Sequence, residues 1–540
     1  MMEMDRKLRF AIIIGSTNLD KWKVDCLSHM LKGKELQLSL VIISPSREST
    51  TTFGLFQLYD RLSRLRSKSL KKTIVDPLIK GVPQYSINPN VSLSPMEIQD
   101  ISAMDLDFIL TFEDEAQISN LQKAARHGVW TYEFGGAPAK FAGYKEIQQK
   151  ESVSRVSLIQ IKEDRKVKLK EGFFSTISHS LCGNRDNIYL TSAKWPAIVC
   201  KSLHHNSDEV ETEESFILQS NSFEMPSFRQ SINYLLNLCK SKAGRLHTKL
   251  FCYEYWNVGI VEKPIEEMLT EVKPKIQWLV QKKDMYYADP FGLVSEDGIQ
   301  LLMEEVNHRV VKGYITSAHI NGKEKKITWN PSILKKPFHM SYPYLFTDNG
   351  EYYCVPETSE ARKVTMYKLD LIEKKWKKIK DLLTDFPAVD STIVKNEDHW
   401  WLFCTKSSES LQSHNNELHI FYATDLFGEW KPHQLNPVKI DCRSSRPAGT
   451  PFRYMDQLYR PAQDCSRTYG GRIVLNRISI LTPSSFKEET ISNVEPRSDS
   501  LYPDGVHTIS SVGDITILDG KRFDYSLFHI FKKLYRFKPI

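Results

Sequence analysis

The sequence lacks the cysteine pattern of a disulfide framework or of a structural zinc site. Its nine cysteines are an odd number, they are scattered from Cys26 to Cys465, and none forms a C-x-x-C pair. Disulfide-rich secreted folds pair their cysteines, and structural zinc sites use closely spaced ones. We therefore expect a reducing compartment, and hence a cytoplasmic location.

Long hydrophobic runs are also missing. The first apolar run, Ala11–Ile14, has four residues, which is too short for the core of a signal peptide. No window approaches the roughly 18 uninterrupted apolar residues of a transmembrane helix. The sequence therefore predicts neither a secretory leader nor a membrane span.

The charge is balanced rather than dominated by one sign. The 73 basic and 66 acidic residues leave a net charge of +7 over 540 residues. This is too small an excess to indicate a nucleic-acid partner, although it is compatible with anionic ligands. With 41% hydrophobic residues, the composition is that of a folded protein, and the length predicts two or three domains.

Strand-like and helix-like segments alternate in the first two hundred residues. Arg9–Ser16 is a buried-strand pattern, Asp20–Gly33 has helical spacing, and Leu36–Ser46 is a second strand. Later strands are expected at Asp105–Phe112 and Gly128–Phe134. This order predicts a doubly wound α/β domain over residues 1–203.

One strand of this domain carries a family signature. The pattern G-V-W-x-Y-x-x-G from Gly128, with a later hairpin at Val156–Thr176, resembles the formyltransferase fold of methionyl-tRNA and sugar N-formyltransferases. In active members the strand reads Asn-x-His-Pro-Ser, but here Thr131 and Glu133 stand at the Asn and His positions. Lys170–Gly172 likewise replaces the acidic hairpin. The resemblance implies a degenerate site without folate; formyl transfer with Glu133 as the base is the alternative.

A basic segment interrupts the same domain. Arg61–Lys72 is rich in arginine and lysine, with leucines interleaved. Such a run is typical of a solvated helix face. Peripheral contact with an anionic membrane, or binding of a phosphorylated ligand, is the more specific hypothesis.

The two halves of the chain are separated by a change in composition. His204–Ser215 is polar and acidic, as linkers are, and Ser227–Gly244 has the pattern of an amphipathic bridging helix. We assign residues 204–249 to this connection. Beyond it the chain becomes dense in aromatic residues, and its segments shorten.

The second half contains a repeat. Ala288–Glu305, Ser341–Thr358 and Val389–Lys406 align without gaps, and each is a strand, a turn and a second strand. Two weaker copies follow, at Arg446–Asp464 and Asp504–Gly520. Further strands lie between the copies. Five repeats of about 50 residues predict an all-β five-bladed propeller over residues 250–540.

The propeller prediction brings certain repeat positions together, because the inner strands of all blades converge. The second position of the aligned copies is occupied by Asp289, Tyr342 and Asp390, and the seventeenth by Glu304, Glu357 and Thr405. The weaker copies add Arg446, Asp464 and His507. Paired carboxylates flanking a sugar are the basis of glycosidic chemistry.

Two other interpretations of these carboxylates stay open. Some of them would instead cap backbone amides at the turns of the blades. A ring of carboxylates would also suit a calcium ion, although no spacing requires one and no metal ligand is assigned.

Two blade motifs resemble family-43 glycoside hydrolases. A-D-P-F at Ala288–Phe291 is similar to the motif of the catalytic base, and V-D-S-T at Val389–Thr392 to that of an orienting carboxylate. The resemblance implies Asp289 as base or nucleophile and Asp390 as the orienting group. It implies a glutamate as acid, for which Glu357 is the first candidate and Glu304 the second.

A further set of motifs resembles the module named after the N-terminal part of glucosamine inositolphosphorylceramide transferase. These motifs are SYPYLF, VPET, VDSTIV, WWLFCT, RPAGTPF and LYRPAQDCSRTYGG, and with the domain order they extend the resemblance over nearly the whole chain. The last motif supplies donors and acceptors suited to a polyhydroxylated ligand. The expected substrate contacts are Arg446, Arg460, Gln463, Asp464, His507 and Tyr342.

These observations favour a carbohydrate-active protein that binds and processes a sugar or glycoconjugate in the propeller. The expected partners are a sugar, a sugar nucleotide or a glycolipid, in glycan, glycolipid or secondary-metabolite biosynthesis. An acyl or formyl transferase acting on an amino sugar is one alternative. A non-catalytic sugar-binding module is the other.

Overall fold

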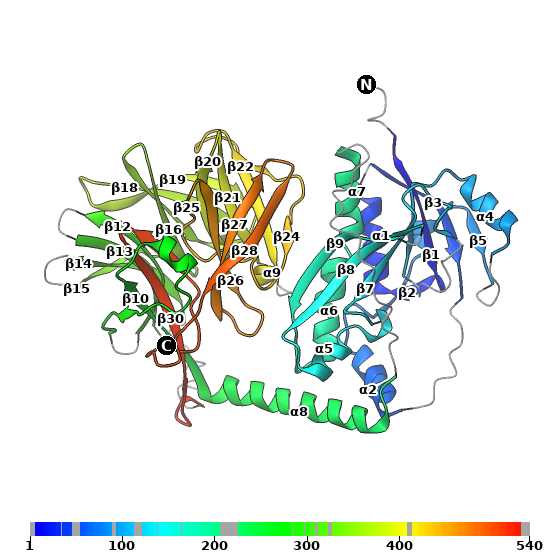
Figure 1. The fold of residues 1–540 in the computed structure, drawn as a ribbon, viewed down its shortest axis with the longest axis horizontal. Helices are drawn as coiled ribbons and strands as arrows, with labels where there is room; N and C mark the ends of the chain where they lie inside the picture. Colours follow the sequence, from blue (N-terminus) through cyan, green and yellow to red (C-terminus); the bar gives the residue numbers. More distant parts are fainter. Residues whose placement is uncertain are drawn as a thin grey trace. The chain divides into compact units, whose positions relative to one another are not determined.

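The computed structural model describes residues 6–33, 35–45, 54–88, 93–112, 121–137, 139–163, 165–205, 225–282, 285–295, 298–307, 312–321, 327–407 and 413–530. The chain divides into two compact units, Met1–Ala243 and Gly244–Ile540 (Figure 1). The division falls within α8 (Phe228–Phe251). Most of the polar linker expected before this helix, residues 206–224, lies outside the described residues.

The first unit is built on a seven-stranded mixed sheet with the strand order β5-β3-β1-β6-β7-β8-β9. The first five strands are parallel, whereas β8 and β9 form an antiparallel hairpin at one end. The chain runs outward from β1 to β5 and then returns to β6 on the other side. The strands are β1 (Leu8–Ile14), β3 (Leu36–Ile43), β5 (Gln84–Ser86), β6 (Phe108–Thr111), β7 (Val129–Phe134), β8 (Val153–Lys162) and β9 (Arg165–Ser175).

Apolar sequence runs explain this core. Residues Phe10–Ile14 of β1 are fully buried because the strand is central in the sheet. Trp22 on α1 (Lys21–Leu31) stacks on Tyr189 of α6 (Leu181–Ser192) at 4.8 Å between ring centroids. The other helices are α2 (Leu55–Arg64), α3 (Asp76–Ile79), α4 (Pro95–Ser102), α5 (Tyr144–Gln149) and α7 (Trp195–His205), and a small second sheet pairs β2 (Asn18–Asp20) with β4 (Lys72–Ile74).

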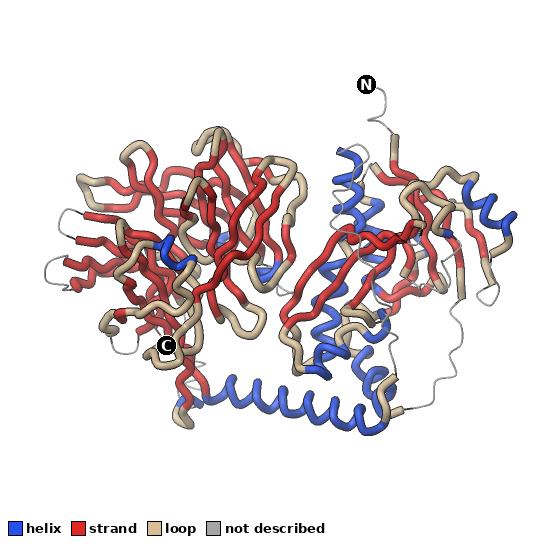
Figure 2. Tube along the Cα trace, viewed as in Figure 1, coloured by secondary structure: helices blue, strands red, loops and turns tan. Residues whose placement is uncertain are grey.

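The second unit is a five-bladed β-propeller, as the repeat predicts (Figure 2). The first four blades follow the chain in order. They are β12–β15 (Met285–Ser295, Gly298–Asn307, Gly313–Asn321, Ile327–Leu334), β16–β19 (Ser341–Asp348, Glu351–Glu357, Lys363–Asp370, Lys375–Thr384), β20–β24 (Ala388–Asn396, His399–Lys406, Glu417–Ala423, Lys431–Pro432, Lys439–Ile440) and β25–β28 (Phe452–Tyr454, Gln457–Asp464, Arg472–Leu481, Phe486–Val494). The short helix α9 (Ser413–Asn416) lies in the third blade.

The fifth blade closes the ring with strands from both ends of the unit. β10 (Cys252–Val261) and β11 (Gln277–Trp278) come before the first repeat, and they join β29 (Ile509–Val512) and β30 (Ile515–Tyr525). β10 pairs with β30 over ten consecutive residue pairs. The last repeat copy is therefore completed by strands that precede the first one, and we call this sheet the closing blade.

Two whole-chain features bear on the sequence predictions. All nine cysteines lie in the described residues, and none of them forms a disulfide. In the part of the chain that the structure describes, no helix combines the length and the apolar composition needed to cross a membrane.

Candidate functional site

The second position of the repeat has an unusual backbone in all three aligned blades. The register of the inner strand pair shifts here in each blade, which is the mark of a β-bulge. Asp289, Tyr342 and Asp390 take left-handed conformations, with φ of 52°, 44° and 51°. This conformation costs a non-glycine residue about 1–3 kcal/mol, and such strain gathers at functional sites. The bulge re-aims these side chains, which all become buried.

The side chain of Tyr342 locates the point where the blades meet. Its hydroxyl accepts a hydrogen bond from the backbone N–H of Gly449, in the fourth blade, at 2.6 Å. The same hydroxyl lies 2.9 Å from Oγ1 of Thr392, in the third blade. A residue of the second blade thus contacts two other blades. We call the buried polar group around it the central cluster, which comprises Asp289, Glu304, Tyr342, Glu357, Asp390, Arg446, Gln463, His507 and Asp519.

Asp289 joins the first blade to its two neighbours. Its Oδ2 accepts the N–H of Tyr342 at 3.1 Å, and its Oδ1 accepts the Oγ1–H of Thr508 at 2.7 Å. The N–H of Asp289 donates to Oδ2 of Asp519, in the closing blade, at 3.0 Å. The carboxylate is therefore fixed from both sides.

His507 lies between two carboxylates. Its Nδ1 is 2.6 Å from Oδ2 of Asp519, and its Nε2 is 3.4 Å from Oδ1 of Asp289. The ring also packs on Trp256, with the ring centroids 4.1 Å apart. Burial by itself opposes protonation of His507, but the negative charges of Asp519 and Asp289 outweigh it and raise its pKa.

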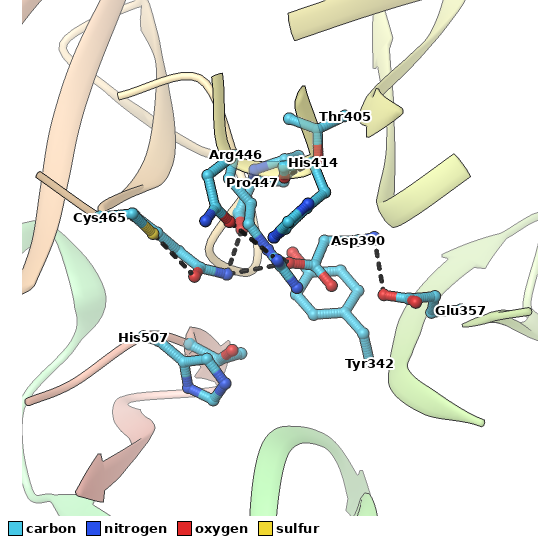
Figure 3. A network of polar contacts seen from close by, with 12 residues as sticks. Tyr342, Glu357, Asp390, Thr405, His414, Arg446, Pro447, Cys465 and His507 are labelled. Carbon is cyan, nitrogen blue, oxygen red and sulfur yellow. Dashed lines mark hydrogen bonds and ion pairs between the residues drawn. The ribbon is translucent and has the colours of Figure 1, made fainter. Parts of the chain in front are cut away.

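Asp390 organises the other side of the central cluster (Figure 3). Its Oδ2 accepts hydrogen bonds from Nε of Arg446 at 2.6 Å and from Nε2 of Gln463 at 2.9 Å. Its backbone N–H donates to Oε2 of Glu357 at 3.3 Å. Arg446 also donates to Oδ1 of Asn415, and its guanidinium lies 4.8 Å from the ring centroid of Tyr469.

The electrostatic consequence is a pair of carboxyl groups with elevated pKa values. Burial raises the pKa of Asp289 to about 7, although His507 opposes the shift. Burial also raises the pKa of Asp390, because it outweighs the opposing charge of Arg446, and nearby Glu357 adds to the rise. A carboxyl group that titrates near neutral pH can serve as a general acid or a general base.

The two candidate acids lie at the ends of the paired strands. Oε1 of Glu357 accepts the hydroxyl hydrogen of Ser359 at 2.8 Å. Oε1 of Glu304 is 3.2 Å from Nε2 of His339. Burial opposes protonation of His339, but the hydrogen bond and charge of Glu304 raise its pKa to about 9. Glu304 is therefore held in an ion pair, whereas Glu357 faces the donors around Asp390.

Two expected substrate contacts lie outside the central cluster. Arg460 is fully buried and donates to both oxygens of Glu488, at 2.9 and 2.7 Å. Asp464 pairs with Arg472 at 2.9 Å. The cause is strand alternation: Gln463 points toward Asp390, so Arg460 and Asp464 project from the opposite face of β26.

Sequence reasoning missed one member of the central cluster, Asp519, and two residues of the closing blade beside it, Lys521 and Trp256. Asp519 and Lys521 lie on β30, within or directly after the last repeat copy, and Trp256 lies on β10, before any copy. The bridge between Gly505 and Lys521 matches the pairing of Ser341 with Glu357. Lys521 is thus the closing-blade counterpart of the seventeenth repeat position. Aligning Gly505 with Ser341 in the sequence would have identified Lys521.

Asp289, His507 and Asp519 also form a group with ligand atoms within 4.8 Å of one another. Calcium prefers six to eight oxygen ligands. Here one ligand would be an imidazole nitrogen, and the oxygens of Asp519 already accept three backbone N–H groups, those of Asp289, His507 and Thr508. The donor set therefore does not fit the calcium ion considered from the sequence.

The strand β7 of the first unit, which carries the formyltransferase-like pattern, has no comparable cluster of buried carboxyl groups among the described residues. Thr131 is buried in β7, and Glu133 lies near its end, 3.5 Å from Nη2 of Arg155. The Arg155 side chain is 45% exposed, so this is a surface ion pair. Glu171, in the facing hairpin, accepts a hydrogen bond from Ser157. The geometry offers Glu133 no buried proton acceptor or donor among the described residues.

The propeller is similar in sequence to known proteins. Residues 279–500 match the family model described as the N-terminal part of glucosamine inositolphosphorylceramide transferase 1. The chain is 35% identical over 207 residues to the protein of that name from Arabidopsis thaliana. It is 31% identical over 211 residues to the one from Oryza sativa subsp. japonica. Residues 279–500 are therefore similar to this family.

The family segment spans the first four blades, from before β12 to after β28. It contains Asp289, Asp390 and Arg446, whereas His507 and Asp519 lie beyond its end. The central cluster thus combines residues of the matched segment with residues of the closing blade. The resemblance expected over nearly the whole chain is confirmed for this segment alone, and the formyltransferase likeness of the first unit stays a prediction.

The matched region is a limited part of both partners. It covers 38% of this chain, and 27% of the Arabidopsis and 28% of the japonica protein. The chain therefore spans about a quarter of the length of these relatives.

Solved structures of glycoside hydrolases are similar at a distance. An exo-β-1,3-galactanase from Clostridium thermocellum is 11% identical with a TM-score of 0.33, over 42% of this chain and 57% of that one. A family 117 glycoside hydrolase from Zobellia galactanivorans is 12% identical with a TM-score of 0.33, over 52% of this chain and 92% of that one. At these values we infer neither fold nor function from them.

Proposed function

We propose that the propeller binds a sugar or glycoconjugate at the central cluster and acts on its glycosidic linkage. The observation that carries the proposal is the convergence of two buried carboxyl groups, Asp289 and Asp390, whose pKa values are raised by burial. Each is held by an independent set of donors from other blades. Such an arrangement suits proton transfer at neutral pH.

The roles follow from the contacts. Asp289, in its ionised form, would take the proton of an attacking water or acceptor hydroxyl. Glu357 would give a proton to the leaving oxygen, as the acid of a carboxyl pair does. Asp390 and Arg446 are already joined at 2.6 Å, and they would orient hydroxyl groups of the sugar. Glu304 is the second candidate acid, but its ion pair with His339 makes it the weaker one.

The relatives give the proposal its substrate class. They are named glucosamine inositolphosphorylceramide transferases, a name that combines an amino sugar with a glycolipid. Because this chain spans about a quarter of their length, their activity is part of the proposal. A sugar nucleotide or a glycolipid is therefore the first ligand to test.

Calorimetry and product analysis with a panel of sugars, sugar nucleotides and glycolipids test the proposal. Asp289→Asn should leave the dissociation constant within about threefold and lower turnover about 100-fold or more. The matched control is Asp370→Asn, which removes a partly exposed carboxylate at the end of β18, outside the central cluster, and should change neither quantity.

The outcomes separate the alternatives. Binding without turnover in the wild-type protein, with carboxylate variants that alter affinity alone, identifies a sugar-binding module. Binding of folate that Glu133→Gln abolishes identifies the formyl transferase. Either result replaces the proposed reaction.

We also propose that the first unit is a doubly wound, formyltransferase-like domain. The strand order, outward from β1 to β5 and back to β6, and the terminal hairpin β8–β9 support this assignment. An experimental structure of residues 1–243 would test it, and helices confined to one face of the sheet would contradict it.

A further inference from the structure

The inner side of the helix α2 carries both an apolar and a charged residue. Phe56 is fully buried and packs on the ring of Tyr144, with the ring centroids 4.5 Å apart. Oδ1 of Asp60 is 2.5 Å from Nη1 of Arg185, and Oδ2 of Asp60 is 2.8 Å from Nε of Arg64. Arg185 is fully buried on α6 and also donates to the carbonyl oxygen of Ala142. Ser63 is buried on the same side. This ion pair fixes the rotation of α2 about its axis.

The opposite side of α2 presents leucines to solvent. Leu58, Leu62 and Leu65 are 44%, 56% and 81% exposed. Their spacing of four and three residues places them on one helical face, the stripe that an ordinary surface helix buries. Because Phe56 and Asp60 occupy the inner side of α2, these leucines form a second apolar face on the outer side.

Cations surround this leucine face. Arg61 is exposed between Leu58 and Leu62, and Arg66, Lys68 and Lys71 are exposed just beyond the helix. The only acidic residue from position 54 to position 72 is Asp60, whose charge is used inside. The exposed side therefore combines apolar area with an excess of positive charge, although the carboxylate of Asp186 on α6 accepts the N–H groups of Lys68 and Ser69.

We propose that α2 binds an anionic lipid surface, with Leu58, Leu62 and Leu65 at the boundary of the acyl chains and the cations at the headgroups. A helix with an apolar face and flanking arginine and lysine lies in the membrane interface, where anionic lipids attract it. A protein partner would need acidic groups of its own facing a stripe of three leucines, whereas an anionic bilayer supplies both environments at once. This inference concerns the first unit and is independent of the chemistry proposed for the propeller.

Vesicle sedimentation of the full chain tests the proposal. At low salt, the wild-type protein should sediment with phosphatidylcholine vesicles that contain phosphatidylserine, and much less with phosphatidylcholine alone. The double variant Leu62→Gln/Leu65→Gln should bind at least about tenfold more weakly than the wild type. Arg66→Gln/Lys68→Gln should also weaken binding and reduce its dependence on salt.

The control is Leu371→Gln/Ile372→Gln, in an exposed turn of the propeller, where the two side chains are 59% and 95% exposed. It should bind as the wild type does. All of the substituted side chains are exposed, so unchanged thermal unfolding verifies that each variant is folded. Absence of sedimentation with anionic vesicles, or equal binding of wild type and leucine variant, overturns the proposal. A dimer of the chain that the leucine variant dissociates, without vesicle binding, overturns it as well.

Discussion

In two buried arginine–carboxylate pairs of the propeller, the pKa of the carboxyl group is shifted in opposite directions. At the edge of the fourth blade, Arg460 and Lys439 both contact Glu488, and the pKa of that carboxyl is lowered to about 2 although burial opposes the shift. In the central cluster, Arg446 contacts Asp390, yet burial raises the pKa of Asp390.

The difference lies in the local count of charges. Glu488 faces two cations, so its ionised form is stabilised more than burial costs it. Asp390 faces one cation, Arg446, and a second carboxylate, Glu357. The negative charge of Asp390 in turn adds to the rise in the pKa of Asp289. The pKa of a buried carboxyl group beside an arginine is therefore lowered when cations are in excess, and raised when carboxylates are.

The largest predicted effect is the loss of the structural pair. Arg460→Leu leaves Glu488 buried with Lys439 alone, and it should lower the free energy of unfolding by about 3–5 kcal/mol, measured by urea denaturation. Ligand affinity, measured below the unfolding transition, should not change.

The control for this prediction is Arg477→Leu on the neighbouring strand, which breaks an exposed pair with Glu489 and should cost about 1 kcal/mol or less. If Arg460→Leu abolished sugar binding in a protein of normal stability, Arg460 would be a substrate contact after all.

A smaller loss of stability is expected when Asp519, the carboxylate that contacts His507, is replaced. Asp519→Asn should lower the free energy of unfolding by about 2–3 kcal/mol, because three backbone N–H groups lose a charged acceptor. The pKa of His507, followed by NMR of its ring, should fall, since the nearest negative charge is removed. Asp524→Asn, whose carboxylate is about half exposed beside His529, is the control. A His507 pKa that stayed raised would contradict the charge-count argument.

The smallest predicted effect is a pH dependence at the edge of the central cluster. Because folding raises the pKa of His339 from 6.5 to about 9, its contribution to stability is complete below pH 6.5 and is lost as the pH rises through about 9. About a third of its side chain is exposed, so screening reduces the loss to about 1 kcal/mol. His339→Gln should remove this part of the dependence, as measured by thermal unfolding across that range. A variant with the wild-type pH profile would show that another group is responsible.

Particular elements show how far the sequence alone could lead. The five blades were predictable, because each repeat shows its strands and turns locally; the turn at Asn349 and Gly350 takes left-handed conformations at both residues, as its Asn-Gly sequence predicts. Asp289, Tyr342 and Asp390 could be grouped because they share one repeat position. The sequence motif grouped Arg460 and Asp464 with Gln463 as substrate contacts. In the structure the side chains alternate along β26, so Arg460 and Asp464 lie on the face opposite to Gln463.

The contacts of the closing blade could not be predicted from the sequence, because they join residues that are far apart in the chain. Asp519 on β30 meets Asp289 across 230 positions of sequence, and no local pattern encodes a pair of that separation. The same holds for Asp60 and Arg185, which orient the leucine face of α2.

The sequence by itself determined the repeat, the hairpins and the shared repeat position of Asp289, Tyr342 and Asp390, because these depend on local periodicity. Tertiary structure alone decided which carboxyl groups have raised pKa values and which have lowered ones. That property depends on how many charges of each sign are buried together, and ring closure brings them from strands at opposite ends of the propeller.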